Sequence, residues 1–187
     1  MSGREVLPLV EGGKGISVSN GESSGAWALA GGVGTFSPDG NNLLYPEFTI
    51  ISAQERPRTH FKNIDLETQQ IEDLIPYEDS VDENEAAWSP DGSKLVITRR
   101  YTDDRYTEGW QIYLLNLENN TVEPLVVDPS YKNVDFFWDP SGQQLVIQRF
   151  PAVADGSPTG ASIWTYEIET KKLTQVITNA FNPRWVP

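Results

Sequence analysis

The segment richest in contact-forming side chains is RRYTDDRYTEGW, residues 99–110. Arginine, tyrosine and tryptophan dominate the binding energy of protein interfaces, because they join apolar area to directed polar groups. Aligned on the preceding turn glycine, a further arginine at 149 is equivalent to the one at 99. These groups predict a binding surface, or else they pair with acidic loops of the same chain. The candidate contact residues are Arg99, Arg100, Tyr101, Arg105, Tyr106, Trp110 and Arg149.

Residue types for catalysis are scarce. The chain has one histidine, His60, no cysteine, and no G-x-S-x-G elbow that would expose a nucleophilic serine. One histidine excludes a His-rich metal site within this chain, and neither a calcium loop nor a nucleotide-binding glycine motif occurs. We interpret the acidic stretch 77–85 as a solvated loop, the alternative being a cation site. We expect a non-enzyme with no catalytic residue, metal or cofactor.

The net charge of −13 limits the partners. An acidic surface repels phosphate backbones, so nucleic acid is not an expected partner. No apolar run reaches the roughly 18–20 residues that a membrane helix needs, so we do not expect membrane insertion. A protein or peptide partner is the remaining expectation.

A repeated pattern must position the contact residues. The segments IDLETQQIEDL, LNLENNTVEPL and YEIETKKLTQV start at residues 64, 115 and 166, each 51 residues after the one before. An aromatic residue followed by a proline–glycine turn also recurs. The motif residues are Phe36, Pro38, Asp39, Gly40; Trp88, Pro90, Asp91, Gly92; Trp138, Pro140, Gly142; and Trp185.

Each repeat reads as four short strands. In the turn, proline presets the backbone and glycine takes the positive φ that leads into the returning strand. The segments KLVIT and QLVIQ after the turns are apolar and β-branched, as strands prefer. Four strands repeated every 40–50 residues or so are typical of β-propeller blades. The pattern therefore predicts an all-β propeller, with the motif aromatics packed between neighbouring antiparallel blades.

The predicted blades do not close a ring. Complete blades are expected at about 26–75, 85–127 and 134–177, with the last strand of a preceding blade at 4–10 and the first strand of a following blade at 179–187. Propellers usually have four to eight blades. The chain is thus expected to be a segment of a larger propeller, or to complete the ring as a homo-oligomer.

The stretch AAWSPDGSKLVITRR, with NPRW near the end of the chain, resembles the WD40-like repeat of the TolB family. The resemblance covers nearly the whole chain. One repeat departs from it, with Asp and Ser exchanged around Pro140. The resemblance implies a periplasmic or otherwise extracytoplasmic propeller that binds another protein.

The same repeat also occurs in propellers of prolyl-oligopeptidase-like hydrolases and oligogalacturonate lyases. Our leading hypothesis is a non-catalytic scaffold that binds a protein or peptide. Its binding face would be formed by the loops that join the second strand to the third, and the fourth strand to the next blade. The alternatives are the substrate-gating propeller of a larger hydrolase, or a sugar- or metal-binding propeller.

Overall fold

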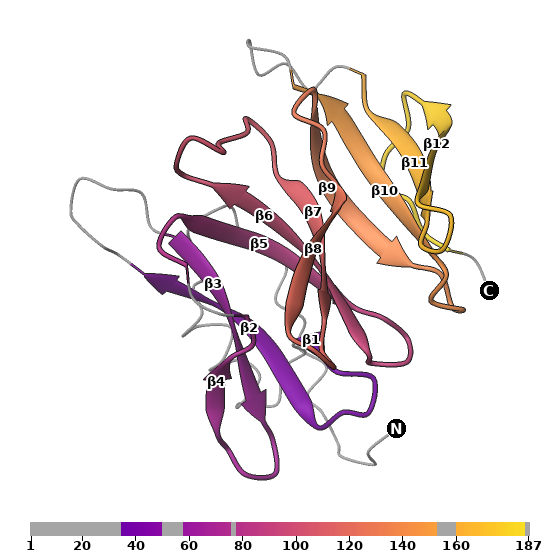
Figure 1. The fold of residues 1–187 in the computed structure, drawn as a ribbon. Helices are drawn as coiled ribbons and strands as arrows, with labels where there is room; N and C mark the ends of the chain where they lie inside the picture. Colours follow the sequence, from indigo (N-terminus) through magenta and orange to yellow (C-terminus); the bar gives the residue numbers. More distant parts are fainter. Residues whose placement is uncertain (1–34, 50–57, 76–77, 153–159, 186–187) are drawn as a thin grey trace. The chain divides into compact units, whose positions relative to one another are not determined.

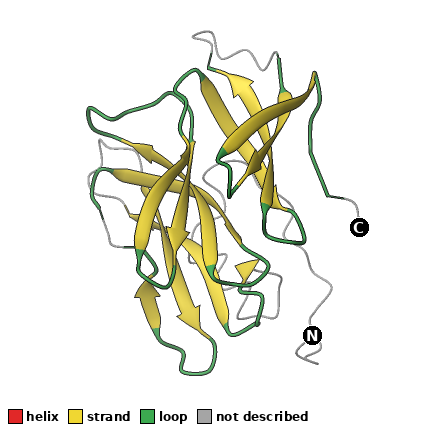
Figure 2. Cartoon of the chain, turned by 45° about the vertical axis from the view of Figure 1, so that its right-hand side comes forward, coloured by secondary structure: helices red, strands yellow, loops and turns green. Residues whose placement is uncertain are grey.

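A computed structural model describes residues 35–49, 58–75, 78–152 and 160–185. These residues form twelve strands, and no helix occurs among them (Figures 1 and 2). The described part of the chain therefore contains no helix that could span a membrane. The strand predicted at 4–10 lies outside the described residues.

The strands pair into three four-stranded sheets, each in the order in which its strands occur in the chain. The first sheet consists of β1 (Thr35–Phe36), β2 (Asn42–Thr49), β3 (Arg58–Asp65) and β4 (Ile71–Asp73). The second consists of β5 (Val81–Trp88), β6 (Lys94–Tyr101), β7 (Gln111–Asn116) and β8 (Thr121–Val126). The third consists of β9 (Tyr131–Trp138), β10 (Gln144–Pro151), β11 (Ser162–Glu167) and β12 (Lys172–Thr178).

The proline–glycine turns join the first two strands of each sheet. Gly40, Gly92 and Gly142 have φ values of 75°, 74° and 71°, which only glycine adopts without strain. The hydroxyl of Ser89 accepts the backbone N–H of Lys94 at 2.9 Å and so closes the second turn. In the third turn Asp139 occupies the serine position, and its carboxylate accepts the N–H of Gln144 at 2.7 Å. The exchange of Asp and Ser therefore preserves the turn.

The chain divides into two compact units, residues 1–83 and 84–187, which we describe separately. In the first unit, Asp82 and Glu83 are buried at 8% and 2% exposure. Their carboxylates accept the backbone N–H groups of Thr59 and Phe61 at 3.0 and 3.1 Å. The acidic stretch 77–85 was predicted to be a solvated loop, and this is wrong from Val81 onward. Strand edges need hydrogen-bond acceptors, and these buried carboxylates supply them.

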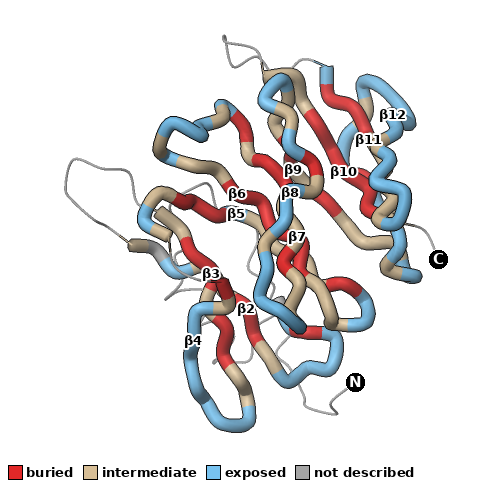
Figure 3. The backbone as a smooth tube through the Cα atoms, viewed as in Figure 1, coloured by how far each residue is buried: buried red, intermediate tan, exposed pale blue. Residues whose placement is uncertain are grey.

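The second unit has an apolar core between the second and third sheets. The middle strands of both sheets are the most buried, whereas β12 is largely exposed (Figure 3). Trp138 packs against this core, and its indole N–H donates to the carbonyl of Ala87 in β5 at 3.0 Å. This is the expected packing of a motif aromatic between neighbouring sheets. The buried core residues are Val96, Ile112, Val126, Phe136, Leu145, Ile147 and Tyr166.

The segment after β12 differs from the prediction. A strand was expected at 179–187, but residues 179–185 form none. The indole N–H of Trp185 nevertheless donates to the carbonyl of Phe137 at 3.1 Å, in the manner of Trp138 and Ala87. A strand is defined by its pairing, and no described segment pairs with 179–185. The motif aromatic thus takes its expected place without the ladder that would make its segment a strand.

Candidate binding cleft

A cleft of about 540 Å³ opens on the second sheet beside the loop between β6 and β7. Its residues come from β6, β7, β8 and the loops after β6 and β8, so both predicted classes of loop contribute. Ile97 of β6 pairs with Tyr113 of β7, which pairs with Pro124 of β8. Alternation along β6 places Tyr101 on the same face. The lining residues are Arg99, Tyr101, Asp104, Arg105, Tyr106, Thr107, Tyr113, Val122, Pro124, Val127 and Pro129.

Tyrosines form one wall of the cleft. The rings of Tyr101 and Tyr113 meet edge to face, with centroids 6.2 Å apart and planes at 79°. Burial, and then the neighbouring phenol of Tyr101, raises the pKa of Tyr113 to about 12. Tyr113 therefore keeps its proton across the physiological range and can donate a hydrogen bond. Tyr106 is 55% exposed and presents its ring to solvent.

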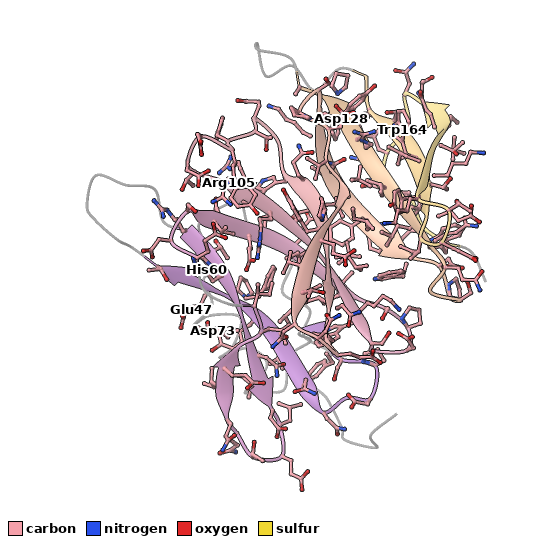
Figure 4. All side chains as sticks on the ribbon, in the orientation of Figure 1. Glu47, His60, Asp73, Arg105, Asp128 and Trp164 are labelled. Atoms are coloured by element: carbon pink, nitrogen blue, oxygen red, sulfur yellow. The ribbon has the colours of Figure 1, made fainter. Side chains whose placement is uncertain are left out.

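Arg105 is held in place before any partner arrives. Its guanidinium lies 3.8 Å from the ring centroid of Tyr101, and it forms an ion pair of 2.5 Å with Asp103. Figure 4 labels Arg105 in the loop that follows β6. A stacked and paired guanidinium loses less conformational freedom on binding than a free side chain does.

Arg100 and Trp110 lie beside the cleft rather than among its lining residues. The guanidinium carbon of Arg100 is 4.6 Å from the ring centroid of Trp110 and 5.9 Å from that of Tyr106. The carbonyl of Trp110 accepts the side-chain N–H of Asn133 at 2.8 Å. These contacts fasten the loop to β9 of the same unit.

Arg149 lies apart from the cleft, in β10, and is 1% exposed. It pairs with Asp128 at 3.0 Å, and its guanidinium carbon is 4.0 Å from the ring centroid of Tyr131 and 4.9 Å from that of Trp164. Figure 4 labels Asp128 and Trp164 at the same end of the third sheet. Arg149 thus pairs with a loop of its own chain, which is the second of the two interpretations that the sequence allowed, and it does not contribute to a binding surface.

Four of the seven predicted contact residues thus line one cleft: Arg99, Tyr101, Arg105 and Tyr106. Sequence reasoning missed Tyr113, Val122 and Pro124, because these residues reach the cleft through the register of β7 and β8. The alternation of Tyr113 with Leu114 in β7 was the available signal. Among the described residues, no group of three or more His, Asp or Glu side chains converges as metal ligands would.

No protein-family model matches the sequence, and no curated protein matches it either. Solved structures do match in fold. A putative TolB from Agrobacterium tumefaciens gives a TM-score of 0.58 at 18% identity, over 76% of this chain and 47% of that one. The chain folds as part of a TolB-like β-propeller.

Enzymes with propellers match nearly as well. An oligogalacturonate lyase from Vibrio parahaemolyticus gives a TM-score of 0.54 at 16% identity, over 76% of this chain and 40% of that one. The acylaminoacyl peptidase of Pyrococcus horikoshii gives 0.54 at 15% identity, over 73% and 23%. The chain spans less than half the length of each of these structures, and identities this low establish the fold alone.

Proposed function

We propose that this TolB-like propeller is a non-catalytic module that captures an extended protein or peptide segment in the cleft. The observation that carries the proposal is the convergence of Tyr101, Tyr106 and Tyr113 with apolar side chains in a cleft of about 540 Å³. Rigid aromatic rings supply contact area at low entropic cost, and phenol and guanidinium groups can bond peptide carbonyls. The resemblance to TolB favours a location outside the cytoplasm.

The test uses peptides selected on the protein itself. A displayed library of random 12-residue peptides is panned against the chain, and selected peptides are titrated by calorimetry. Replacing Tyr101, Arg105 and Tyr106 together with alanine should weaken binding about a hundredfold or more, as loss of clustered anchors does. The melting temperature should fall only modestly, because Arg105 and Tyr106 are exposed and Tyr101 is half-buried.

The matched control is Phe181→Ala. Phe181 is also an exposed aromatic, at 58% exposure, but it does not line the cleft. Its replacement should leave peptide affinity unchanged. Equal losses in both variants, or undiminished binding in the triple variant, would rule out the cleft as the contact.

A second candidate is the propeller part of a larger hydrolase, favoured by the fold match to the Pyrococcus horikoshii acylaminoacyl peptidase. The discriminating experiment treats the full-length gene product with a fluorophosphonate, which labels activated serines. Labelling outside residues 1–187 would favour the hydrolase. An unlabelled product would favour the binding module.

A further inference from the structure

The outer strand of the third sheet exposes apolar side chains that have buried counterparts in the second sheet. Val176 and Ile177 are 60% and 53% exposed, and Phe181 nearby is 58% exposed. We call these three residues the β12 surface. Ile177 pairs with Ile163 next to a bulge, as Val126 pairs with Ile112 next to a bulge in the second sheet. Val126 is only 4% exposed, so equivalent positions differ sharply in burial.

The side chains that bury Val126 show what kind of surface would bury the β12 surface. Val126 belongs to the same buried core as Tyr166 of the third sheet. Leu173 and Trp138, also of the third sheet, pack against this core. Side chains of the third sheet, among them a leucine of its outer strand and its motif aromatic, therefore belong to the core that buries Val126 of the second sheet. On the third sheet, the inner residues Val146 and Ile163 are buried at 8% and 7%, but the outer strand remains exposed.

The first sheet carries the matching residues, and they are exposed as well. Ile71 pairs with Ile64 as Leu173 pairs with Tyr166, and Phe36 pairs with Leu43 as Trp138 pairs with Leu145. Ile71 is 59% exposed and Phe36 is 40% exposed. We call Phe36 and Ile71 the β4 surface.

We propose that the β12 surface of one copy of this chain binds the β4 surface of a second copy. The contact would repeat, between molecules, the packing of the third sheet on the second. Such a contact joins two different surfaces, and two copies bound in this way can close into a ring that satisfies both pairs of surfaces. The proposal is independent of the cleft, because none of its residues lines the cleft.

The chain's own Trp185 covers part of the third-sheet face to which the second copy would bind. The indole N–H of Trp185 donates to the carbonyl of Phe137 in β9, as that of Trp138 donates to the carbonyl of Ala87 in β5. Trp185 therefore occupies the place that Phe36 of the second copy would take. Docking of the first sheet therefore displaces the Trp185 side chain from this place. W185A should lower the dissociation constant of the dimer several-fold, and weaker association of W185A would overturn the head-to-tail arrangement.

Sedimentation velocity over a range of concentrations tests the proposal. The wild-type chain should show a monomer–dimer equilibrium, and I177D should raise the dissociation constant by about tenfold or more. The matched control is Q175D, an exposed position of β12 that pairs with Trp164 and so points to the opposite face. Q175D should dimerise like the wild type. A monomeric wild type, or equal effects of Q175D and I177D, would overturn the proposal.

Mixing variants identifies the partner surface. I71D and I177K should each dimerise poorly alone. Mixed in equal amounts, they should form heterodimers, because one contact is fully wild-type and the other joins opposite charges. Circular dichroism checks that both variants fold, which is expected because both positions are exposed. No recovery on mixing would exclude the β4 surface as the partner of the β12 surface.

Discussion

Arg149 shows how burial turns a charged residue into a structural one. Burial lowers the pKa of its guanidinium, against the opposing effect of the hydrogen bond that the guanidinium donates to Asp128. Its Nε–H also donates to Asn133 at 3.0 Å. R149M should cost about 3 kcal/mol, because it leaves an unpaired carboxylate and a buried amide oxygen. D128N should also be destabilising, because it leaves the buried guanidinium of Arg149, 1% exposed, without its counter-ion. Urea unfolding measures both variants, and unchanged stability in either would contradict the structural role.

Glu85 makes stability depend on pH. Burial, and then the charge of Asp135, raises the pKa of Glu85 from 4.5 to about 7. The folded state therefore binds the proton more tightly than the unfolded state does. This contribution to stability is complete below pH 4.5 and is lost as the pH rises through about 7. E85Q should be more stable than the wild type at pH 8, on the order of 1–3 kcal/mol. Thermal unfolding at pH 5 and pH 8 checks this, and an unchanged difference between the two proteins would refute it.

At the scale of elements, Trp138 couples the second and third sheets. W138F keeps an aromatic ring but leaves the carbonyl of Ala87 without its indole donor, which should cost about 1 kcal/mol. W138A also opens a cavity beside the core and should cost about 3 kcal/mol. Guanidinium unfolding separates the two variants. Equal costs would mean that the hydrogen bond, and not the ring, supplies the coupling.

Gly109 sets the distance between the cleft loop and β9. A Cβ atom at this position would lie 2.5 Å from the Cα of Lys132, closer than real Cβ atoms approach backbone. G109A should therefore push the loop away from β9, at a cost of about 1–3 kcal/mol. It should also weaken peptide binding, although Gly109 does not line the cleft. Hydrogen exchange of residues 102–110 reports the displacement, and exchange identical to the wild type would disprove it.

At the scale of the whole molecule, the charge of −13 opposes self-association. The proposed contact is apolar, so it brings no opposite charges together, and the repulsion between two acidic copies remains. Salt screens this repulsion, with a Debye length of about 10 Å at 0.1 M. Raising the sodium chloride concentration from about 20 to about 300 mM should therefore lower the dissociation constant of the dimer. Sedimentation at both concentrations tests this. Weakening by salt would indicate a contact made by opposite charges.

Much of the architecture could be predicted from the sequence because it depends on local chemistry. Gly92 and Gly142 have the positive φ that the turn motif requires, and the apolar segments that follow them are strands. The periodic aromatics predicted sheets packed against one another, and the hydrogen bond from Trp138 to Ala87 confirms this for the second and third sheets.

The sequence by itself determined the repeat, the turns and the all-β fold, since each depends on residues close together in the chain. Only the tertiary structure decided that Tyr113 and Pro124 join Tyr101 at the cleft, because strand register brings distant residues onto one face. It also decided that Arg149 is buried while Ile177 is exposed. Burial is set by which sheet covers which, and no local sequence pattern carries that information.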